Sequence, residues 1–382
     1  MKSQKVKKAI VSVTNDLVSD NRVHRTCSVL TEMGYEVILV GRRLTGSLPI
    51  QRAYKTHRFK LLFKRKFTFY AEYNVRLFFF LLFHRADLLV ANDLDTLVAN
   101  FYISKIKKCP LLYDSHEYFT EVPELIHRKK IQRFWSKIEN KIFPKLPFAI
   151  TVSDSIANEY SKKYNVPVYT IRNVPTIKEN KKKKDVSLIF HSFTNLLMYQ
   201  GALNIGRGIE NLIESMLYLD SDTVLLIVGK GDVEKELHEK VNELKLNERV
   251  KFLGKIPIEE LCEYTLNADL GFSLEDDRGL NYRFALPNKI FDYIQASVPV
   301  VCSDLPEMKK LVHHYNVGIC LNETQRQPNV LAQIIKDALS NTVKLNEWKE
   351  NCRKASKELN WEKEKETLRA LLQKLVDGTF IF

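Results

Sequence analysis

The clearest chemical pattern in the chain lies in residues 286–301, which read Leu-Pro-Asn-Lys-Ile-Phe-Asp-Tyr-Ile-Gln-Ala-Ser-Val-Pro-Val-Val. Pro287 suits the first turn of a helix, because the N–H that proline lacks would be unpaired there. The pattern therefore predicts a helix followed by a buried strand. Asn288 and Lys289 lie four and three positions before Asp292, so the three side chains share one helical face. A carboxylate beside a cation and an amide suits a polyol such as a ribose. The alternative is a capped helix with an ordinary Lys/Asp ion pair on its surface, which would have the same sequence.

A second pattern is the glycine-rich segment 199–210, which follows an apolar run and opens a helix pattern. Gly201, Gly206 and Gly208 allow the backbone to approach a ligand closely, and a helix N-terminus offers unpaired N–H groups. Arg207 can fork onto two phosphate oxygens. The segment favours a phosphate site, with a purely structural turn as the alternative.

Polar side chains also follow two apolar runs in the first half of the chain. Asp93 comes after the run 87–91, and His116 and Glu117 come after the run 110–113. The carboxyl ends of parallel strands are where α/β proteins bind ligands. A histidine flanked by acids is well placed to have its pKa shifted. We take the three as candidates for substrate recognition or proton handling, although a lone histidine is more often structural.

The chain as a whole predicts two α/β domains. At 382 residues it is long for one core, and with 45% hydrophobic and 27% charged residues it is globular. Short apolar runs alternate with helical patterns in both halves, which indicates parallel sheets covered on both faces. The lysine-rich stretch 178–185 reads as a solvated linker. We therefore expect two doubly wound, Rossmann-like domains, 1–177 and 186–361, that face each other across a cleft.

The segment 286–301 resembles the donor-nucleotide helix of retaining glycosyltransferases of the GT-B fold, family 4. Members often read L-P-N-K-L-F-E-Y-M-A-A-G-x-P-V-V. Here Asp292 replaces the usual glutamate, which keeps the carboxylate but shortens its reach, and Ser297 replaces the usual glycine. The resemblance covers nearly the full chain, is strongest over 199–301, and implies that the tail 362–382 crosses back onto the first domain.

Other residues of the second half fit the same family. Gly201 and Arg207 stand where members bind the donor diphosphate, and Gly254 lies in the segment where the base stacks. Lys230 is a candidate phosphate contact, with an exposed loop lysine as the alternative. Relatives often carry the first glutamate of an E-x7-E pair before the donor helix. Counting back from Asp292 gives Phe284, so the literal spacing is broken. Glu275, at the end of a predicted strand, is the nearest acid in a suitable position, and it either contacts the donor sugar or caps a loop.

The resemblance implies transfer of a sugar from a UDP- or GDP-linked donor to a glycan or lipid-linked acceptor, with retention and without metal. Arg207 and Lys289 would offset charge on the leaving diphosphate, and Asp292 would hold the ribose. His116, Asp93 and Glu117 would handle the acceptor. Residues 93–95 also spell the D-x-D metal pattern of a different glycosyltransferase fold, but so do residues 220–222, and we attribute both to chance.

Charge suggests further partners. The net charge of +13 indicates an anionic one. The segment 51–76 has eight Lys/Arg against one acid, interleaved with aromatic rings, which suits an anionic membrane surface. The apolar run 77–83 is far shorter than a membrane span and is expected in the core. The scattered cysteines, and an apolar run 9–13 that is too short for a signal peptide, predict a cytoplasmic protein with the inner membrane face as a candidate contact.

Three other interpretations stay open at this point. The charge and the segment 51–76 would also suit a nucleic-acid-binding protein, although we expect no nucleic acid. The broken glutamate pair would suit a relative that binds nucleotide without turnover. A nicotinamide oxidoreductase is disfavoured, because no G-x-G-x-x-G follows the first strand.

Overall fold

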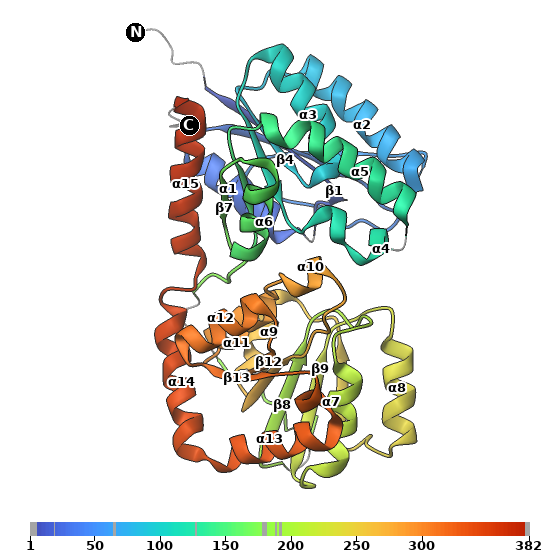
Figure 1. Ribbon diagram of the computed structural model, residues 1–382, viewed down its shortest axis with the longest axis vertical. Helices are drawn as coiled ribbons and strands as arrows, with labels where there is room; N and C mark the ends of the chain where they lie inside the picture. The colour runs from blue at the N-terminus through green and yellow to red at the C-terminus, as the bar shows by residue number, and fades with distance from the viewer. Residues whose placement is uncertain are drawn as a thin grey trace. The chain divides into compact units, whose positions relative to one another are not determined.

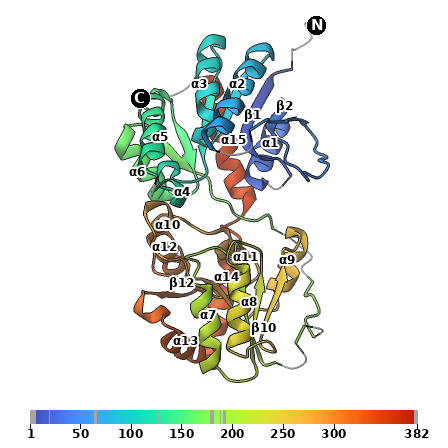
Figure 2. The ribbon, with the colours of Figure 1, turned by 90° about the vertical axis from the view of Figure 1, so that its right-hand side faces the viewer.

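The computed structural model describes residues 6–18, 20–63, 66–126, 128–177, 182–187, 189–190 and 193–378. The chain forms two compact units (Figures 1 and 2). Unit 1 comprises residues 1–173 and 364–382, and unit 2 comprises residues 174–363. Part of the expected linker, residues 178–181, lies outside the described residues.

Unit 1 is built on a parallel sheet of seven strands in the order β3-β2-β1-β4-β5-β6-β7. Its strands are β1 Lys8–Asp16, β2 Glu36–Arg42, β3 Lys55–Phe59, β4 Leu88–Asn92, β5 Leu111–Ser115, β6 Ala149–Thr151 and β7 Val168–Thr170. Strands β4 and β5 are buried along their whole length, as expected for central strands covered on both faces.

Helices cover both faces of this sheet (Figure 1). They are α1 Asn21–Glu32, α2 Lys66–Phe83, α3 Leu94–Lys107, α4 Pro123–Ile126, α5 Lys129–Ile142, α6 Asp154–Tyr164 and α15 Trp361–Asp377. Since β1–α1–β2 and β4–α3–β5 run in opposite directions along the sheet, right-handed crossovers place α1 and α3 on opposite faces. Helices α2, α3 and α5 share one face. Helix α15 lies beside α1, where Lys365 and Arg369 both pair with Glu32 at 2.8 Å.

Unit 2 has a parallel sheet of six strands in the order β10-β9-β8-β11-β12-β13. The strands are β8 Asn195–Gln200, β9 Thr223–Val228, β10 Val250–Gly254, β11 Leu270–Ser273, β12 Val300–Ser303 and β13 Gly318–Leu321. The helices are α7 Ile209–Ser215, α8 Glu234–Glu243, α9 Ile258–Thr265, α10 Leu280–Arg283, α11 Asn288–Gln295, α12 Pro306–Tyr315, α13 Pro328–Ser340 and α14 Thr342–Ser356.

The predicted α/β class, with two doubly wound parallel sheets, is confirmed. The tail also behaves as expected, because α15 begins at Trp361 and its residues from Glu364 onward belong to unit 1. Among the described residues, no helix is both long enough and apolar enough to span a bilayer.

The basic and aromatic segment 51–76 does not form a separate surface loop. It contributes β3 and the first half of α2, and four of its rings are buried: Tyr54, Phe59, Phe69 and Tyr73. Lys64 and Arg65 lie outside the described residues. The run 77–83 is likewise divided between the core and the surface. Leu77 and Leu81 are buried, as predicted, but Phe79 and Phe83 are exposed to solvent.

Candidate active site

Glycines stand at the carboxyl ends of three neighbouring strands of unit 2, and their backbones pack closely together. Gly201 and Gly229 directly follow β8 and β9, and Gly254 is the last residue of β10. A Cβ on Gly229 would lie 1.8 Å from the carbonyl oxygen of Gly201, so the turns after β8 and β9 require glycine at this contact. The N–H of Gly229 also donates to the carbonyl of Gly254, at the end of β10, over 2.8 Å. The result is a surface of bare backbone at the carboxyl edge of the sheet, bordered by Lys230, whose Cε would lie 3.4 Å from a Cβ on Gly254.

Two predicted cations converge on one buried carboxylate beside this surface. Lys289 Nζ lies 2.8 Å from Glu275 Oε1, and Arg207 Nη1 lies 3.4 Å from the same oxygen. The other carboxylate oxygen accepts a 2.7 Å hydrogen bond from the hydroxyl of Ser273. The Glu275 side chain is 1% exposed and that of Lys289 is 8% exposed. Glu275 therefore positions the two cations rather than facing solvent.

The charges of this cluster do not balance. Burial disfavours the charged form of Glu275, but Lys289 and Arg207 outweigh it and lower the pKa of the carboxyl. Burial also opposes the charge on Lys289, but Glu275 outweighs it and raises the pKa of the amine. Glu275 and Lys289 are thus both charged at neutral pH. The guanidinium of Arg207 is a second cation facing the one anion. Such an excess of positive charge among largely buried side chains favours an anionic ligand.

The remaining donor-site candidates lie on or near α11. Asp292 Oδ2 accepts a 3.0 Å hydrogen bond from the side-chain amide of Gln200, at the end of β8. Gln200 is itself held by the hydroxyl of Thr265 over 2.8 Å. The carboxylate of Asp292 is therefore fixed at the end of β8. Asn288 is exposed at the first position of the helix.

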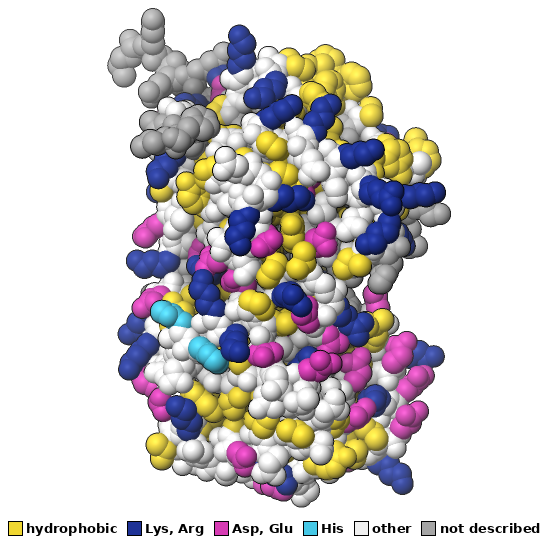
Figure 3. All heavy atoms as spheres, in the orientation of Figure 1, with side chains coloured by type: hydrophobic (Ala, Val, Ile, Leu, Met, Phe, Trp, Pro, Cys, Tyr) yellow, Lys and Arg dark blue, Asp and Glu magenta, His cyan; other side chains and the backbone are white. Residues whose placement is uncertain are grey.

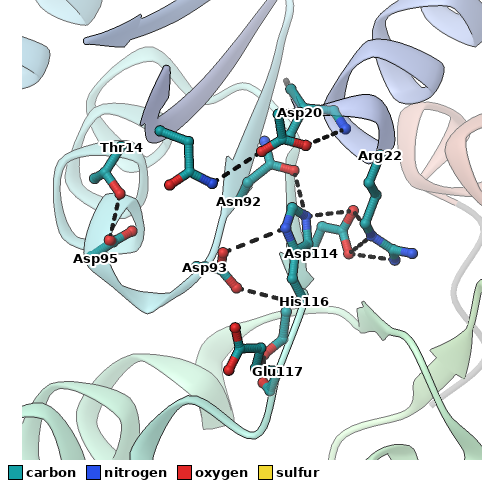
Figure 4. A network of polar contacts seen from close by, with 12 residues as sticks. Thr14, Asp20, Arg22, Asn92, Asp93, Asp95, Asp114, His116 and Glu117 are labelled. Atoms are coloured by element: carbon teal, nitrogen blue, oxygen red, sulfur yellow. Dashed lines mark hydrogen bonds and ion pairs between the residues drawn. The ribbon is translucent and has the colours of Figure 1, made fainter. Parts of the chain in front are cut away.

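In unit 1, the predicted residues at the ends of β4 and β5 form one polar network (Figure 4). His116 Nδ1 lies 3.4 Å from Asp93 Oδ2, and its Nε2 lies 3.5 Å from Asp114 Oδ2 and 3.2 Å from Asn92 Oδ1. The backbone N–H of His116 also donates to Asp93 Oδ1 over 2.8 Å. Arg22, from α1, donates hydrogen bonds from Nε and Nη2 to the carboxylate of Asp114 over 2.6–3.1 Å.

This geometry makes His116 an imidazolium. Both ring nitrogens face oxygen atoms that can only accept, so a neutral ring would point its lone pair at one of them. Burial lowers the pKa of His116, but Asp93 and Asp114 outweigh it and raise the pKa to about 9. Burial also disfavours the charged form of Asp114, but Arg22 and His116 lower its pKa to about 2. A protonated ring cannot act as a base at neutral pH.

Asp93 has a strained backbone. Its φ of 60° and ψ of 164° fall in a region that is otherwise almost restricted to glycine and costs on the order of 1–3 kcal/mol. Strain of this kind persists where the surroundings enforce it, and here the carboxylate is pinned by His116. The third candidate, Glu117, is exposed, and its carboxylate points away from the imidazole in Figure 4.

The structure adds residues that sequence reasoning missed. Ser273 and Tyr199 support the cation cluster, since the ring of Tyr199 lies 4.2 Å from Lys289 Nζ. In unit 1, Asp114 favours the positive charge of His116, and Arg22 holds the carboxylate of Asp114 in place. Asp114 stands two positions before His116, so its place at the end of an apolar run was the available signal. No local pattern marked Arg22, because its partners are more than ninety positions away. Among the described residues, no group of three or more His, Cys, Asp or Glu side chains could hold a metal ion.

Two doubly wound units, with a tail helix whose residues from Glu364 onward return to the first unit, are typical of the GT-B fold. Residues 20–176 match the family model described as Glycosyltransferase Family 4, and residues 180–355 match that of Glycosyl transferases group 1. The chain belongs to this family, so the recognition made from residues 286–301 is confirmed.

Solved structures show the same fold. A sucrose-phosphate synthase from Thermosynechococcus elongatus superposes with a TM-score of 0.81 at 17% identity, covering 98% of this chain and 100% of that one. Anabaena HepE in complex with UDP-glucose gives a TM-score of 0.71 at 17% identity, with 96% and 99% covered. A curated relative, chitobiosyldiphosphodolichol beta-mannosyltransferase of Candida albicans, is 28% identical over 129 residues. That match spans 33% of this chain and 27% of the relative.

Proposed function

We propose that this glycosyltransferase uses a nucleoside-diphosphate sugar, UDP- or GDP-linked, and transfers the sugar to a glycan or lipid-linked acceptor. The observation that carries the proposal is the convergence of Lys289 and Arg207 on the buried Glu275 beside a surface of bare backbone. HepE, with the same fold, has been solved with UDP-glucose. The matched relative is named for mannose transfer to a lipid-linked chitobiosyl diphosphate, which supports an acceptor of that class.

In this proposal unit 2 binds the donor. Arg207 and Lys289 stabilise the negative charge that develops on the diphosphate as the bond to the anomeric carbon breaks. Asp292, fixed by Gln200, accepts hydroxyl hydrogens of the ribose. Asn288 and Lys230 are exposed beside this site and contact the nucleotide from its rim, and the backbone at Gly254 lies under the base. The two fixed cations supply charge stabilisation that needs no metal.

We assign the acceptor to unit 1. The acceptor hydroxyl binds at Asp93, which His116 orients, and Glu117 contacts the acceptor from the exposed rim. Because His116 is already protonated, it does not take the acceptor proton. That proton passes to the oxygen of the leaving diphosphate as the new bond to the anomeric carbon forms on the same face, so that the anomeric configuration is retained. We place the enzyme in the cytoplasm, in the synthesis of cell-surface polysaccharide.

Donor turnover tests this proposal. The full chain is incubated with UDP- and GDP-linked sugars in the presence of EDTA, and release of free UDP or GDP is measured with and without candidate lipid-linked acceptors. We expect release from one nucleotide class, with loss of at least about tenfold in kcat/KM for Asp292→Asn, and no loss for the exposed control Asp277→Asn. Binding without release from any donor would support the inactive relative instead, and dependence on added metal would contradict the metal-free mechanism.

A further inference from the structure

Helices α2, α3 and α5 present large apolar side chains to solvent on the face of unit 1 that they share. Along α2, Val75, Phe79 and Phe83 are spaced by four positions and form one stripe. Phe79 is 52% exposed and Phe83 78% exposed, and their rings stack with centroids 6.3 Å apart. On α3, Tyr102 and Ile106 are likewise four apart and exposed. Exposed apolar groups gathered in this way mark a contact surface rather than a random scatter.

Helix α5 continues the surface. Its exposed Phe134 packs edge-to-face against the exposed Phe67 at the start of α2, with centroids 5.4 Å apart. Lys130, Lys137 and Lys141 lie four positions before, three after and seven after Phe134, so they share its helical face. All three lysines are exposed. The apolar groups of this surface are thus directly interleaved with cations.

The charge on these helices is one-sided. Their exposed cations in the described part of the chain are Arg76, Lys105, Lys129, Lys130, Arg133, Lys137 and Lys141. The three acidic side chains of the same helices are either buried or paired, so they add little negative charge to the surface. Asp95 and Glu139 are buried, and Glu72 pairs with Arg76 at 2.8 Å and accepts from the N–H groups of two loop residues before α2. Figure 3 shows the outcome over α2 and α3, where hydrophobic and basic side chains lie together at the upper right.

We propose that this face, which we call the α2–α3–α5 surface, docks unit 1 onto an anionic phospholipid bilayer. Aromatic and aliphatic groups that lie among lysines suit the boundary between headgroups and acyl chains, where the rings are buried and the lysines meet phosphates. Nucleic acid would not use exposed aliphatic side chains such as Val75 and Ile106, because its backbone offers them no apolar partner. The inference rests on unit 1 alone and does not depend on which donor the enzyme uses.

Vesicle flotation with the full chain tests the proposal. The vesicles contain phosphatidylcholine alone, or phosphatidylcholine with about one third phosphatidylglycerol. We expect binding to the anionic vesicles only, reduced as salt rises from about 0.1 M to about 1 M because the charges are screened. The variants are Phe79→Ser/Phe83→Ser and Lys130→Glu/Lys137→Glu, each expected to weaken binding at least about tenfold.

Matched controls come from exposed positions of unit 2. Val343→Ser and Lys235→Glu remove an exposed apolar group and reverse an exposed charge there, and both should bind vesicles as the parent chain does. All changed side chains are exposed, so thermal unfolding and UDP binding should stay unchanged. No flotation with anionic vesicles, or equal flotation of all variants, would overturn the proposal. It would also be overturned if the surface variants converted a stable dimer to monomer in sedimentation, because a second copy of the chain would then be the partner.

Discussion

Glu275 carries the negative charge against which Lys289 and Arg207 are held, and its removal should be costly. Glu275→Gln keeps the shape but leaves two poorly solvated cations facing a neutral amide. We expect destabilisation of about 3 kcal/mol, measured by chemical denaturation, whereas Asp277→Asn in an exposed pair with Arg283 should change stability by less than about 1 kcal/mol.

The same variant also tests the ligand. A nucleoside diphosphate brings negative charge to the cations, so it should raise the Tm of Glu275→Gln by more than it raises that of the parent chain. An equal or smaller shift in the variant would show that the diphosphate does not lie against these two side chains.

Protonation of His116 should make the folded protein lose stability as the pH rises into the alkaline range. The folded-state pKa of about 9 lies above the unfolded value of roughly 6.5. Its contribution is therefore fully present below about pH 6.5 and is lost as pH rises to about 9, with an upper bound of about 3 kcal/mol. Denaturation measured across this window should show the loss in the parent chain and in the exposed control His314→Gln, but a flatter profile in His116→Gln. An unchanged slope in His116→Gln would rule out the imidazolium.

Helix α11 ends in a conformation that its sequence does not favour. Ser297 follows the helix with φ of +60°, where an L side chain is strained and glycine is not. Ser297→Gly should stabilise the protein by about 1 kcal/mol, measured as a raised denaturation midpoint. Ala296→Gly, one position earlier with φ of −84°, should instead destabilise it. Destabilisation by Ser297→Gly would mean that the hydroxyl makes a contact worth more than the strain.

How far the elements could be predicted depended on their hydrophobic pattern. Central strands such as β4 can be predicted because they are continuous apolar runs in the sequence. The edge strand β3 reads Lys-Thr-His-Arg-Phe, with only its last residue buried, so its sequence carries no strand signal. The four-residue strand β13 at the other sheet's edge is similarly short and only partly buried. Neither segment contains the long, fully buried apolar run that marks a central strand.

The sites divide in the same way. Lys289 and Asp292 could be proposed from the sequence because they lie on one short helix within a continuous motif. The contact of Glu275 with two cations could not be predicted from the sequence, because Arg207 and Lys289 come from two other segments. The expected E-x7-E spacing is also broken, so it does not point to Glu275. The imidazolium state of His116 depends on Asp93 and Asp114. Asp114 is in turn held by Arg22, which lies 92 positions away in the sequence. Such charge pairs are set by tertiary packing and leave no local pattern.

At the scale of the whole molecule, the tail helix α15 belongs to the core of unit 1 although it is the last part of the chain. Leu368, Leu371, Leu372 and Leu375 are buried. Leu372→Ala should destabilise unit 1 by about 2–5 kcal/mol. Hydrogen exchange should then accelerate in β1 and α1 but not in unit 2, whereas the exposed control Lys374→Ala should leave both unchanged. Faster exchange confined to unit 2 would contradict the assignment of the tail.

We propose that unit 2 holds a nucleoside diphosphate on Arg207 and Lys289, and calorimetric titration measures this binding. UDP, GDP and ADP are titrated in EDTA into the full chain, Arg207→Gln and the exposed control Arg353→Gln. We predict that one nucleotide binds, that Arg207→Gln weakens it at least about tenfold, and that Arg353→Gln does not. Absence of binding by all three nucleotides, or equal binding to the parent chain and Arg207→Gln, would contradict the account.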